Sequence, residues 1–145
     1  MNIPALSECS KLIKIKDHST ADTAAVTSDA VDTQGYRAAF FFTSFGTAAA
    51  NNTVKLQQSD DDAATDAYSD LEGTSVSSGT SDEDVWIDII KPRKRYLKLV
   101  AARGTSSTLE SVWVLLYSPL ALAVDNTTSG TIAGETTISP AEGTA

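Results

Sequence analysis

The sequence predicts an all-β fold: a jelly-roll-like β-sandwich of about eight short strands with an extended C-terminal arm. Short runs in which apolar and polar residues alternate recur along the chain, as they do in strands with one buried face. Turn-forming residues separate these runs at spacings of about 8–12 residues. Long stretches with helical periodicity are missing, so helices contribute little to the predicted fold.

The first half of the chain contains five strand candidates. They are Lys11–Lys16, Ala24–Ser28, Tyr36–Phe45, Thr53–Ser59, and a broken pair formed by Ala67–Leu71 and Thr74–Ser77. The run Tyr36–Phe45 is rich in aromatic residues, which favour strands. Thr53–Ser59 alternates cleanly, with Val54 and Leu56 on one face. The acidic stretch 60–66 is the one place where a single helical turn is expected.

The second half contains three further strands. Asp84–Ile90 places three β-branched residues on one face and Trp86 on the other. Lys94–Ala102 alternates in the same way, with Leu97 directed inward. Leu109–Ser118 is apolar on both faces, which predicts a central strand that is covered on both sides.

Residues 1–118 are predicted to form one domain, in which residues 1–22 are partly extended, and residues 119–145 to form the arm. The aromatic residues lie within residues 35–118, and none lies in residues 119–145. Leu120, Leu122 and Val124 alternate at the start of the arm. Spaced apolar residues of this kind suit an extended segment that docks on another surface, so these three are candidate partner contacts. A solvated low-complexity tail is the alternative.

Eleven basic and nineteen acidic residues give a formal net charge of −8. This balance disfavours nucleic acids, whose binding needs Lys and Arg side chains near phosphates. It also disfavours anionic membranes, so no nucleic acid and no membrane is expected as a partner. The first ten residues lack the basic and apolar regions of a secretory signal, and we therefore expect synthesis in the cytoplasm.

Catalytic and metal-binding patterns are not apparent. Cys9 and His18 are the single cysteine and histidine, and neither has the surroundings of a nucleophile site. The Gly-x-Ser-x-Gly elbow and the Gly-rich phosphate loops are absent from the sequence. The acidic run 60–72 begins like a calcium loop, but Ala64 and Thr65 break the required pattern. We expect no enzyme activity, no cofactor and no metal.

A basic run stands out in this acidic chain: Lys91, Arg93, Lys94 and Arg95 surround Pro92. Proline confines the run to an edge or a corner of the sheet. One interpretation is a contact with an acidic partner surface, for example the Asp60–Asp62 loop of an identical copy. The other is a solvated corner that protects a strand edge from aggregation.

Two stretches, Tyr36–Val76 and Val85–Arg103, resemble a known family. Gly35–Thr47 (GYRAAFFFTSFGT) is followed by VKLQQSDD, then by Tyr68–Thr74, and later by Pro92–Lys98. This order is similar to that of the capsid cement, or decoration, proteins of short-tailed bacteriophages. The resemblance implies a virion structural protein on the capsid exterior that forms a homodimer or homotrimer and bridges subunits of the major capsid protein.

Two other functions remain open from the sequence. One is a head–tail connector or tail structural protein, because such proteins also use β-sandwiches. The other is a carbohydrate-binding β-sandwich module, for which Trp86 and Trp113 are the candidate contacts. Both tryptophans lie in strands whose pattern favours packing in the core.

Overall fold

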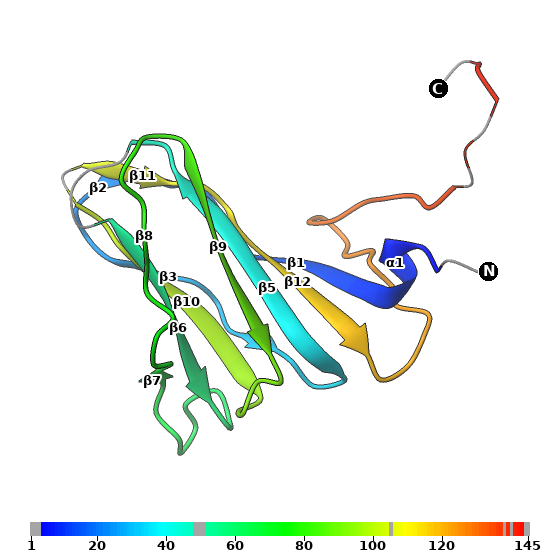
Figure 1. Cartoon of the computed structure of the whole chain (residues 1–145), viewed down its shortest axis with the longest axis horizontal. Helices are drawn as coiled ribbons and strands as arrows, with labels where there is room; N and C mark the ends of the chain where they lie inside the picture. Colours follow the sequence, from blue (N-terminus) through cyan, green and yellow to red (C-terminus); the bar gives the residue numbers. More distant parts are fainter. Residues whose placement is uncertain (1–3, 48–51, 105, 138, 140, 144–145) are drawn as a thin grey trace.

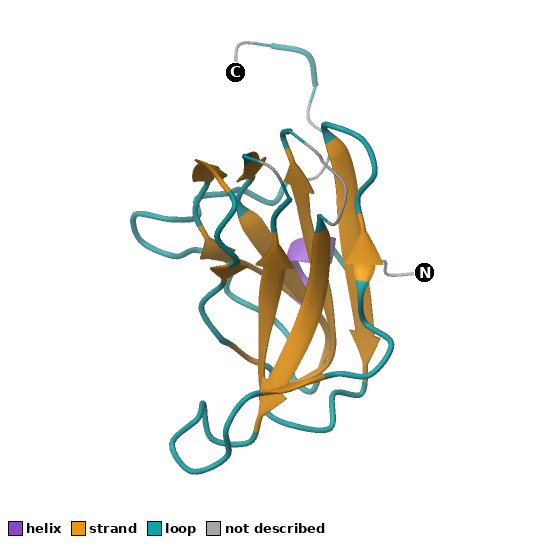
Figure 2. Cartoon of the chain, turned by 90° about the vertical axis from the view of Figure 1, so that its left-hand side faces the viewer, coloured by secondary structure: helices purple, strands orange, loops and turns teal. Residues whose placement is uncertain are grey.

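The computed structural model describes residues 4–47, 52–104, 106–137, 139 and 141–143. Two antiparallel sheets pack face to face, and the chain passes repeatedly from one to the other (Figure 1). Seen from the side, strands make up nearly all of the regular structure (Figure 2). The all-β class predicted from the sequence is confirmed.

Most elements are short. Sheet A contains β1 (Ser10–Lys16), β2 (Ser19–Asp22), β5 (Tyr36–Phe45), β9 (Glu83–Ile90), β11 (Ser107–Leu109) and β12 (Val112–Pro119). Sheet B contains β3 (Val26–Thr27), β4 (Val31–Asp32), β6 (Thr53–Ser59), β7 (Ser69–Asp70), β8 (Val76–Ser77) and β10 (Tyr96–Ala102). A single turn of helix, α1 (Leu6–Cys9), precedes β1.

The strands group into the eight of a jelly roll. β2 continues β1 and β11 leads into β12, because the two pairs follow one antiparallel ladder from Ser10↔Tyr117 to Asp22↔Ser107. β3 and β4 both pair with β10, and β7 and β8 both pair with β6. We count β1–β2, β3–β4, β7–β8 and β11–β12 as one composite strand each and number the resulting eight strands in chain order. Their order is then 1-8-3-6 across sheet A and 2-7-4-5 across sheet B. This interleaved order is that of a jelly roll.

The core lies between the two sheets. Its largest fully buried side chains are Phe41, Phe45, Leu56, Leu97, Leu99, Leu109 and Leu116. The longer strands β6, β9, β10 and β12 contribute alternate residues to this layer, as the period of two requires. Burial of these apolar side chains supplies the main favourable term for folding.

Four elements were not predicted from the sequence: α1, β2, β4, and β11, which overlaps the predicted strand Leu109–Ser118 only at Leu109. Each has only two to four residues, too few for a periodic pattern to show. The single helical turn expected within residues 60–66 is wrong, because this stretch is a turn with positive φ at Asp62 and Ala63. Across the described ranges, no helix is long and apolar enough to cross a membrane.

Candidate binding surfaces

The outer face of sheet A carries aromatic side chains. In β5, Ala39 and Phe41 point into the core, so Phe40 and Phe42 point outward. The Phe40 ring stacks on Trp86 of β9, with ring centroids 5.5 Å apart and planes inclined by 19°. Phe42 lies 6.1 Å from Phe40. Trp86 remains 60% exposed despite this contact.

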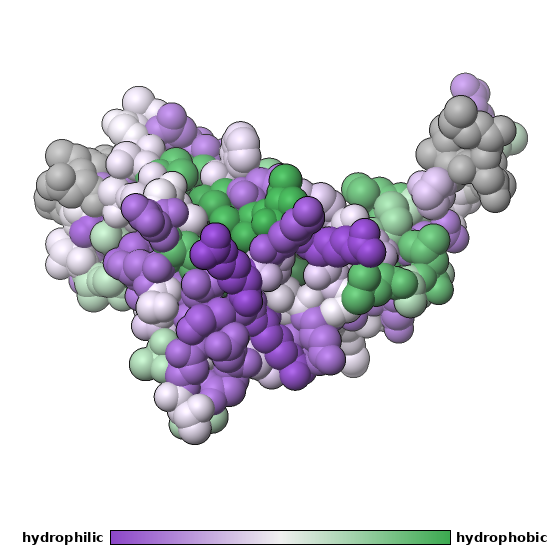
Figure 3. Space-filling model, turned by 60° about the horizontal axis from the view of Figure 1, so that its bottom comes forward, coloured by the Kyte–Doolittle hydropathy of each residue, from purple (hydrophilic) through white to green (hydrophobic). Residues whose placement is uncertain are grey.

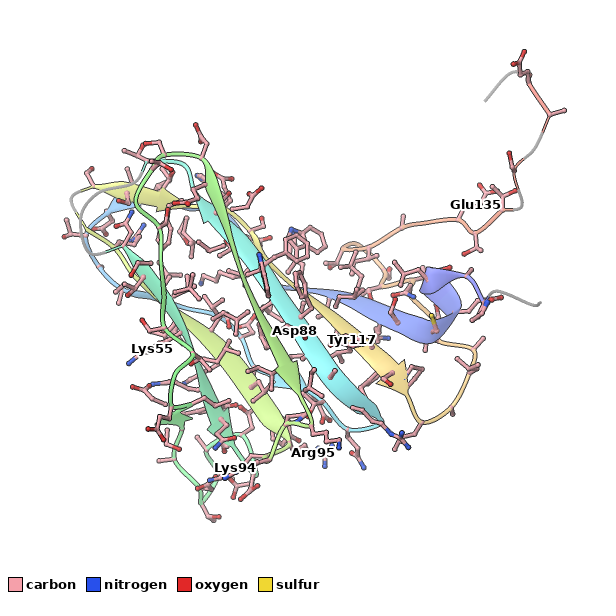
Figure 4. The ribbon with its side chains drawn as sticks, in the orientation of Figure 1. Lys55, Asp88, Lys94, Arg95, Tyr117 and Glu135 are labelled. Carbon is pink, nitrogen blue, oxygen red and sulfur yellow. The ribbon has the colours of Figure 1, made fainter. Side chains whose placement is uncertain are left out.

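The strand register extends this face across four strands. One outward row runs Lys14, Trp113, Phe42 and Trp86, and the next runs Leu12, Leu115, Phe40 and Asp88. Asp88 accepts hydrogen bonds from the Tyr117 hydroxyl at 2.8 and 2.9 Å, which bridges β12 to β9 across β5 (Figure 4). Burial, together with that carboxylate, raises the pKa of Tyr117. We call this surface, centred on Phe40, Phe42 and Trp86, the aromatic face.

The expected core packing of the two tryptophans is wrong for Trp86, which is exposed on the aromatic face, and Trp113 is half-buried on the same face. The same register corrects the prediction that Leu109–Ser118 is covered on both sides. Sheet B covers the inner side chains of β12, such as Val114, whereas Trp113 and Tyr117 on its outer side face solvent in part. The aromatic residues of β12 therefore lie on the outer surface of sheet A, while its inner aliphatic residues lie in the core.

The basic run forms the turn between β9 and β10, at one end of the sandwich (Figure 4). Lys94 Nζ lies 2.6 Å from Asp66 Oδ2 and 3.8 Å from Asp60 Oδ2. Arg95 donates two hydrogen bonds to Asp32, at 2.9 and 2.7 Å. The bond from Lys94 holds the pKa of Asp66 below its usual range, and Arg95 does the same for Asp32. Lys94 and Arg95 thus stabilise the chain's own loops.

The other two cations of the run differ. Lys91 and Arg93 are exposed, and within the described ranges neither pairs with an acidic side chain. With Arg37, which is also exposed, they line an open hollow at this end of the molecule. The Lys91 backbone has a φ of +54° where the chain leaves β9. Lys91 and Arg93 are therefore the members of the run that remain available to a partner.

The acidic stretch 60–66 is a self-contained loop. Asp61 accepts hydrogen bonds from the Thr65 hydroxyl and from the N–H groups of Thr65 and Asp66. These bonds, that of the hydroxyl foremost, lower the pKa of Asp61. Lys94 of the same chain already occupies Asp66. The loop that the sequence suggested as a partner for an identical copy's basic run therefore pairs within its own chain.

Residues 120–137 turn back onto the N-terminal segment of the same chain (Figure 1). Asn126 makes the central contact: its Oδ1 accepts from the Leu12 N–H at 2.7 Å, and its Nδ2 donates to the Ser7 and Ser10 carbonyls at 2.6 and 2.7 Å. The Val124 N–H donates to the Glu8 carbonyl at 3.1 Å. The Asn126 side chain thereby hydrogen-bonds to the outer edge of β1, as the backbone of a further strand would.

Of the three candidate contacts in the arm, two are exposed and the third, Val124, packs within the same chain. Leu120 and Leu122 are 66% and 67% exposed. Val124 is half-buried and, with Leu12, Leu115 and Ile132, lines a pocket between the segment and sheet A. Ile138 lies outside the described residues. Figure 3 shows this end as an apolar area, separated by hydrophilic side chains from a second apolar area over the sheets.

The residues with possible catalytic chemistry lie apart. Cys9 ends α1 and His18 follows β1, so the seven residues of β1 separate them by about 23 Å. The Cys9 thiol donates to the Leu6 carbonyl, and His18 Nδ1 lies 3.2 Å from Glu110 Oε2. In the described part of the chain, no three His, Cys, Asp or Glu side chains group closely enough to hold a metal ion.

The comparisons with known proteins bear on the fold. No known family and no curated protein matches the sequence. Among solved structures, the chain is similar to the SPBc2 prophage-derived protein YomS, with a TM-score of 0.52 and 10% identity over 81% of this chain and 100% of that one. A chain from Bacillus endospore appendages, described as disulfide-linked pili, has a TM-score of 0.45 and 13% identity over 83% of this chain and 98% of that one. The likeness to YomS supports the β-sandwich fold.

Sequence reasoning missed three contributors to these surfaces: the outward pair Phe40 and Phe42, the cation Arg37, and Asn126. The period of two in β5 was sufficient to find the phenylalanines, because Ala39 and Phe41 cannot share a face with Phe40 and Phe42. Arg37 precedes that strand's apolar run and meets Lys91 only through strand pairing. Asn126 had no local signal, since its partners lie 114 to 119 residues away.

Proposed function

We propose that this protein is a virion structural protein that binds the outside of a phage head and cements adjacent subunits of the major capsid protein. The aromatic face is the observation that carries the proposal. Exposed apolar surface that is contiguous over several strands marks a site of association rather than a free surface. Trp86, 60% exposed and held flat by Phe40, is the prominent part of that face.

Two further observations support a phage origin. The stretches Gly35–Thr47 and Pro92–Lys98 resemble those of capsid cement proteins. The fold is similar to that of YomS, which is described as prophage-derived. The capsid exterior as location, the major capsid protein as partner, and a role without enzyme activity or cofactor are parts of this proposal.

The mechanism is additive binding. Each copy contributes one aromatic face and the exposed Leu120 and Leu122, and these are modest contacts on their own. The capsid lattice presents many equivalent positions at fixed spacing, so a copy that contacts two subunits gains from effective concentration. The net charge of −8 keeps free copies apart before assembly.

A head-binding assay tests the proposal. Heads that lack the protein are mixed with the purified chain, and bound protein is measured after sedimentation together with the temperature at which the heads rupture. The chain is expected to bind and to raise that temperature, whereas Phe42→Ala and Trp86→Ala together weaken binding at least tenfold, the effect of losing about 1.4 kcal/mol. Leu6→Ala is the matched control, because Leu6 is 66% exposed on α1, outside the aromatic face.

The proposal fails if the wild-type chain does not bind such heads. It also fails for the aromatic face if the double variant binds as well as the Leu6→Ala control. A head–tail connector or tail protein would leave the shell unoccupied and bind instead at one vertex or along the tail, which electron microscopy of labelled protein distinguishes.

A carbohydrate-binding module is the second candidate, and the Trp86–Phe40 stack is the observation that favours it. A flat, exposed aromatic side chain offers an apolar platform on which a sugar ring can pack. Soluble oligosaccharides would then change the Trp86 fluorescence in a saturable way, and the change would be lost in Trp86→Ala. A flat titration removes this candidate.

A further inference from the structure

β9 is an edge strand with an open side. Among the strands that the structure describes, it pairs with β5 alone, over residues 83–90. The Lys91 N–H donates to the Arg37 carbonyl at 2.7 Å, and in an antiparallel ladder such bonded positions alternate. Residues 83, 85, 87 and 89 therefore bond to β5, and the backbone groups of Asp84, Trp86, Asp88 and Ile90 face away from it.

In the part of the chain that the structure describes, no strand pairs with that side. β8 lies next to β9 but pairs with β6, and the two leave a groove of about 430 Å³ lined by Val76, Ser77 and residues 83–88. The opposite edge of sheet A differs, because Asn126 satisfies Ser10 and Leu12 of β1. The structure thus closes one edge of this sheet with its own chain and leaves the other edge free for a partner strand.

The charges along β9 show which partner fits. Asp82, Glu83 and Asp84 stand at its start, and Lys91 and Arg93 follow its end; all five are exposed. In an antiparallel pair of two β9 strands, the acidic start of each lies beside the basic end of the other. A second copy of this chain therefore supplies the acidic complement that Lys91 and Arg93 lack among the described residues of their own molecule.

The register follows from the outward side chains. A two-fold axis perpendicular to the sheet keeps the aromatic face on one side, so paired residue numbers have an even sum. The two registers with the longest overlap have sums of 172 and 174. The first places Asp84 opposite Asp88, which like charges disfavour. The second places Trp86 opposite Asp88, Asp84 opposite Ile90, and Glu83 opposite Lys91.

We infer that the protein forms a two-fold dimer through antiparallel pairing of β9 with β9 of a second copy, in the register that places Glu83 opposite the partner's Lys91. The two Trp86 side chains then lie diagonally across the axis, which reduces the exposure of both. The two sheets A join into one continuous sheet, and both aromatic faces point the same way. This inference does not rest on the proposed function, because it follows from the edge and its charges.

Charge reversal tests the interface in both directions. Lys91→Glu with Arg93→Glu makes β9 acidic at both ends, and Glu83→Lys with Asp84→Lys makes it basic at both ends. Sedimentation equilibrium of the full chain is expected to show a dimer for the wild type, with the dissociation constant of each double variant raised at least about tenfold. An equimolar mixture of the two double variants is expected to associate again, because both contacts are then between opposite charges.

The matched control is Lys16→Glu, a charge change at the far edge of the sheet, in β1. It is expected to leave the dimer intact. A wild-type chain that remains monomeric at concentrations up to about 100 µM overturns the inference, as does a dimer that both double variants leave unchanged. A mixture that stays monomeric also overturns it, since the pairing of charges is then not antiparallel.

Hydrogen exchange on the wild-type chain gives a readout that needs no variant. The outward amides of Trp86, Asp88 and Ile90 are expected to exchange slowly at high protein concentration and at least tenfold faster on dilution, while those of Val85 and Ile87 stay protected at both. Outward amides whose exchange does not depend on concentration contradict the pairing. Head binding is a separate measurement, so failure of the dimer and failure of the proposed function are distinguishable.

Discussion

Asn126→Ala is expected to release residues 120–137 from the N-terminal segment. The side chain makes three hydrogen bonds, to Leu12, Ser7 and Ser10, at 2.6 to 2.7 Å. At a net value of about 1 kcal/mol each, and with water replacing part of the loss at this edge, the docked state loses about 2 kcal/mol. The Leu12 amide, which bonds to Asn126 Oδ1, should then exchange about 30-fold faster.

Native-state hydrogen exchange followed by NMR measures this directly. Asn126→Asp keeps the shape and the acceptor for Leu12 but places a carboxylate against two carbonyls, so it is expected to release the segment as well. Thr127→Ala is the matched control, since the bond described for Thr127 comes from its backbone N–H. Exchange of the Leu12 amide within threefold of wild type in Asn126→Ala would refute the reasoning, because threefold corresponds to only about 0.7 kcal/mol.

Three further predictions concern stability and exposure. Because Lys94 lowers the pKa of Asp66, the contribution of this ion pair to stability is present above about pH 4 and is lost as the pH falls through the folded-state pKa. The urea concentration at the unfolding midpoint should therefore decrease as the pH is lowered through that range, and it should decrease less in Asp66→Asn. Phe41→Ala should lower the free energy of unfolding by about 3–5 kcal/mol and Phe42→Ala by about 1 kcal/mol, because Phe41 is fully buried and Phe42 is 38% exposed. Equal losses in chemical denaturation would contradict the assignment of the two side chains to opposite faces of β5. Acrylamide should quench Trp86 readily in dilute protein, and Trp86→Phe should remove that accessible component of the fluorescence.

Strand positions could be read from the sequence where alternation runs over seven or more residues. The predicted bounds of Tyr36–Phe45 and Thr53–Ser59 match β5 and β6. Burial fixes such strands, because a shift by one residue would turn the apolar face toward water. β2 and β4 could not be predicted, because two to four residues are too few to show a periodic pattern. Their positions come from pairing with β11 and β10, which are distant in the sequence.

The candidate surfaces were predictable only in part. The basic run was visible, but the sequence could not show that Lys94 and Arg95 pair within the chain while Lys91 and Arg93 do not. That division depends on which loops the fold brings to the β9–β10 turn. Trp86 was expected in the core because aromatic residues in strands are usually packed. The edge position of β9 decides otherwise, and strand order is a property of the whole topology.

The copy number of this protein in purified phage particles tests the cement function most directly. Gel densitometry against the major capsid protein measures it without any labelled or altered protein. The account predicts a copy number near that of the major capsid protein, because each lattice position offers an equivalent site. A number below about twenty would contradict it, since only a connector or tail component follows such low symmetry.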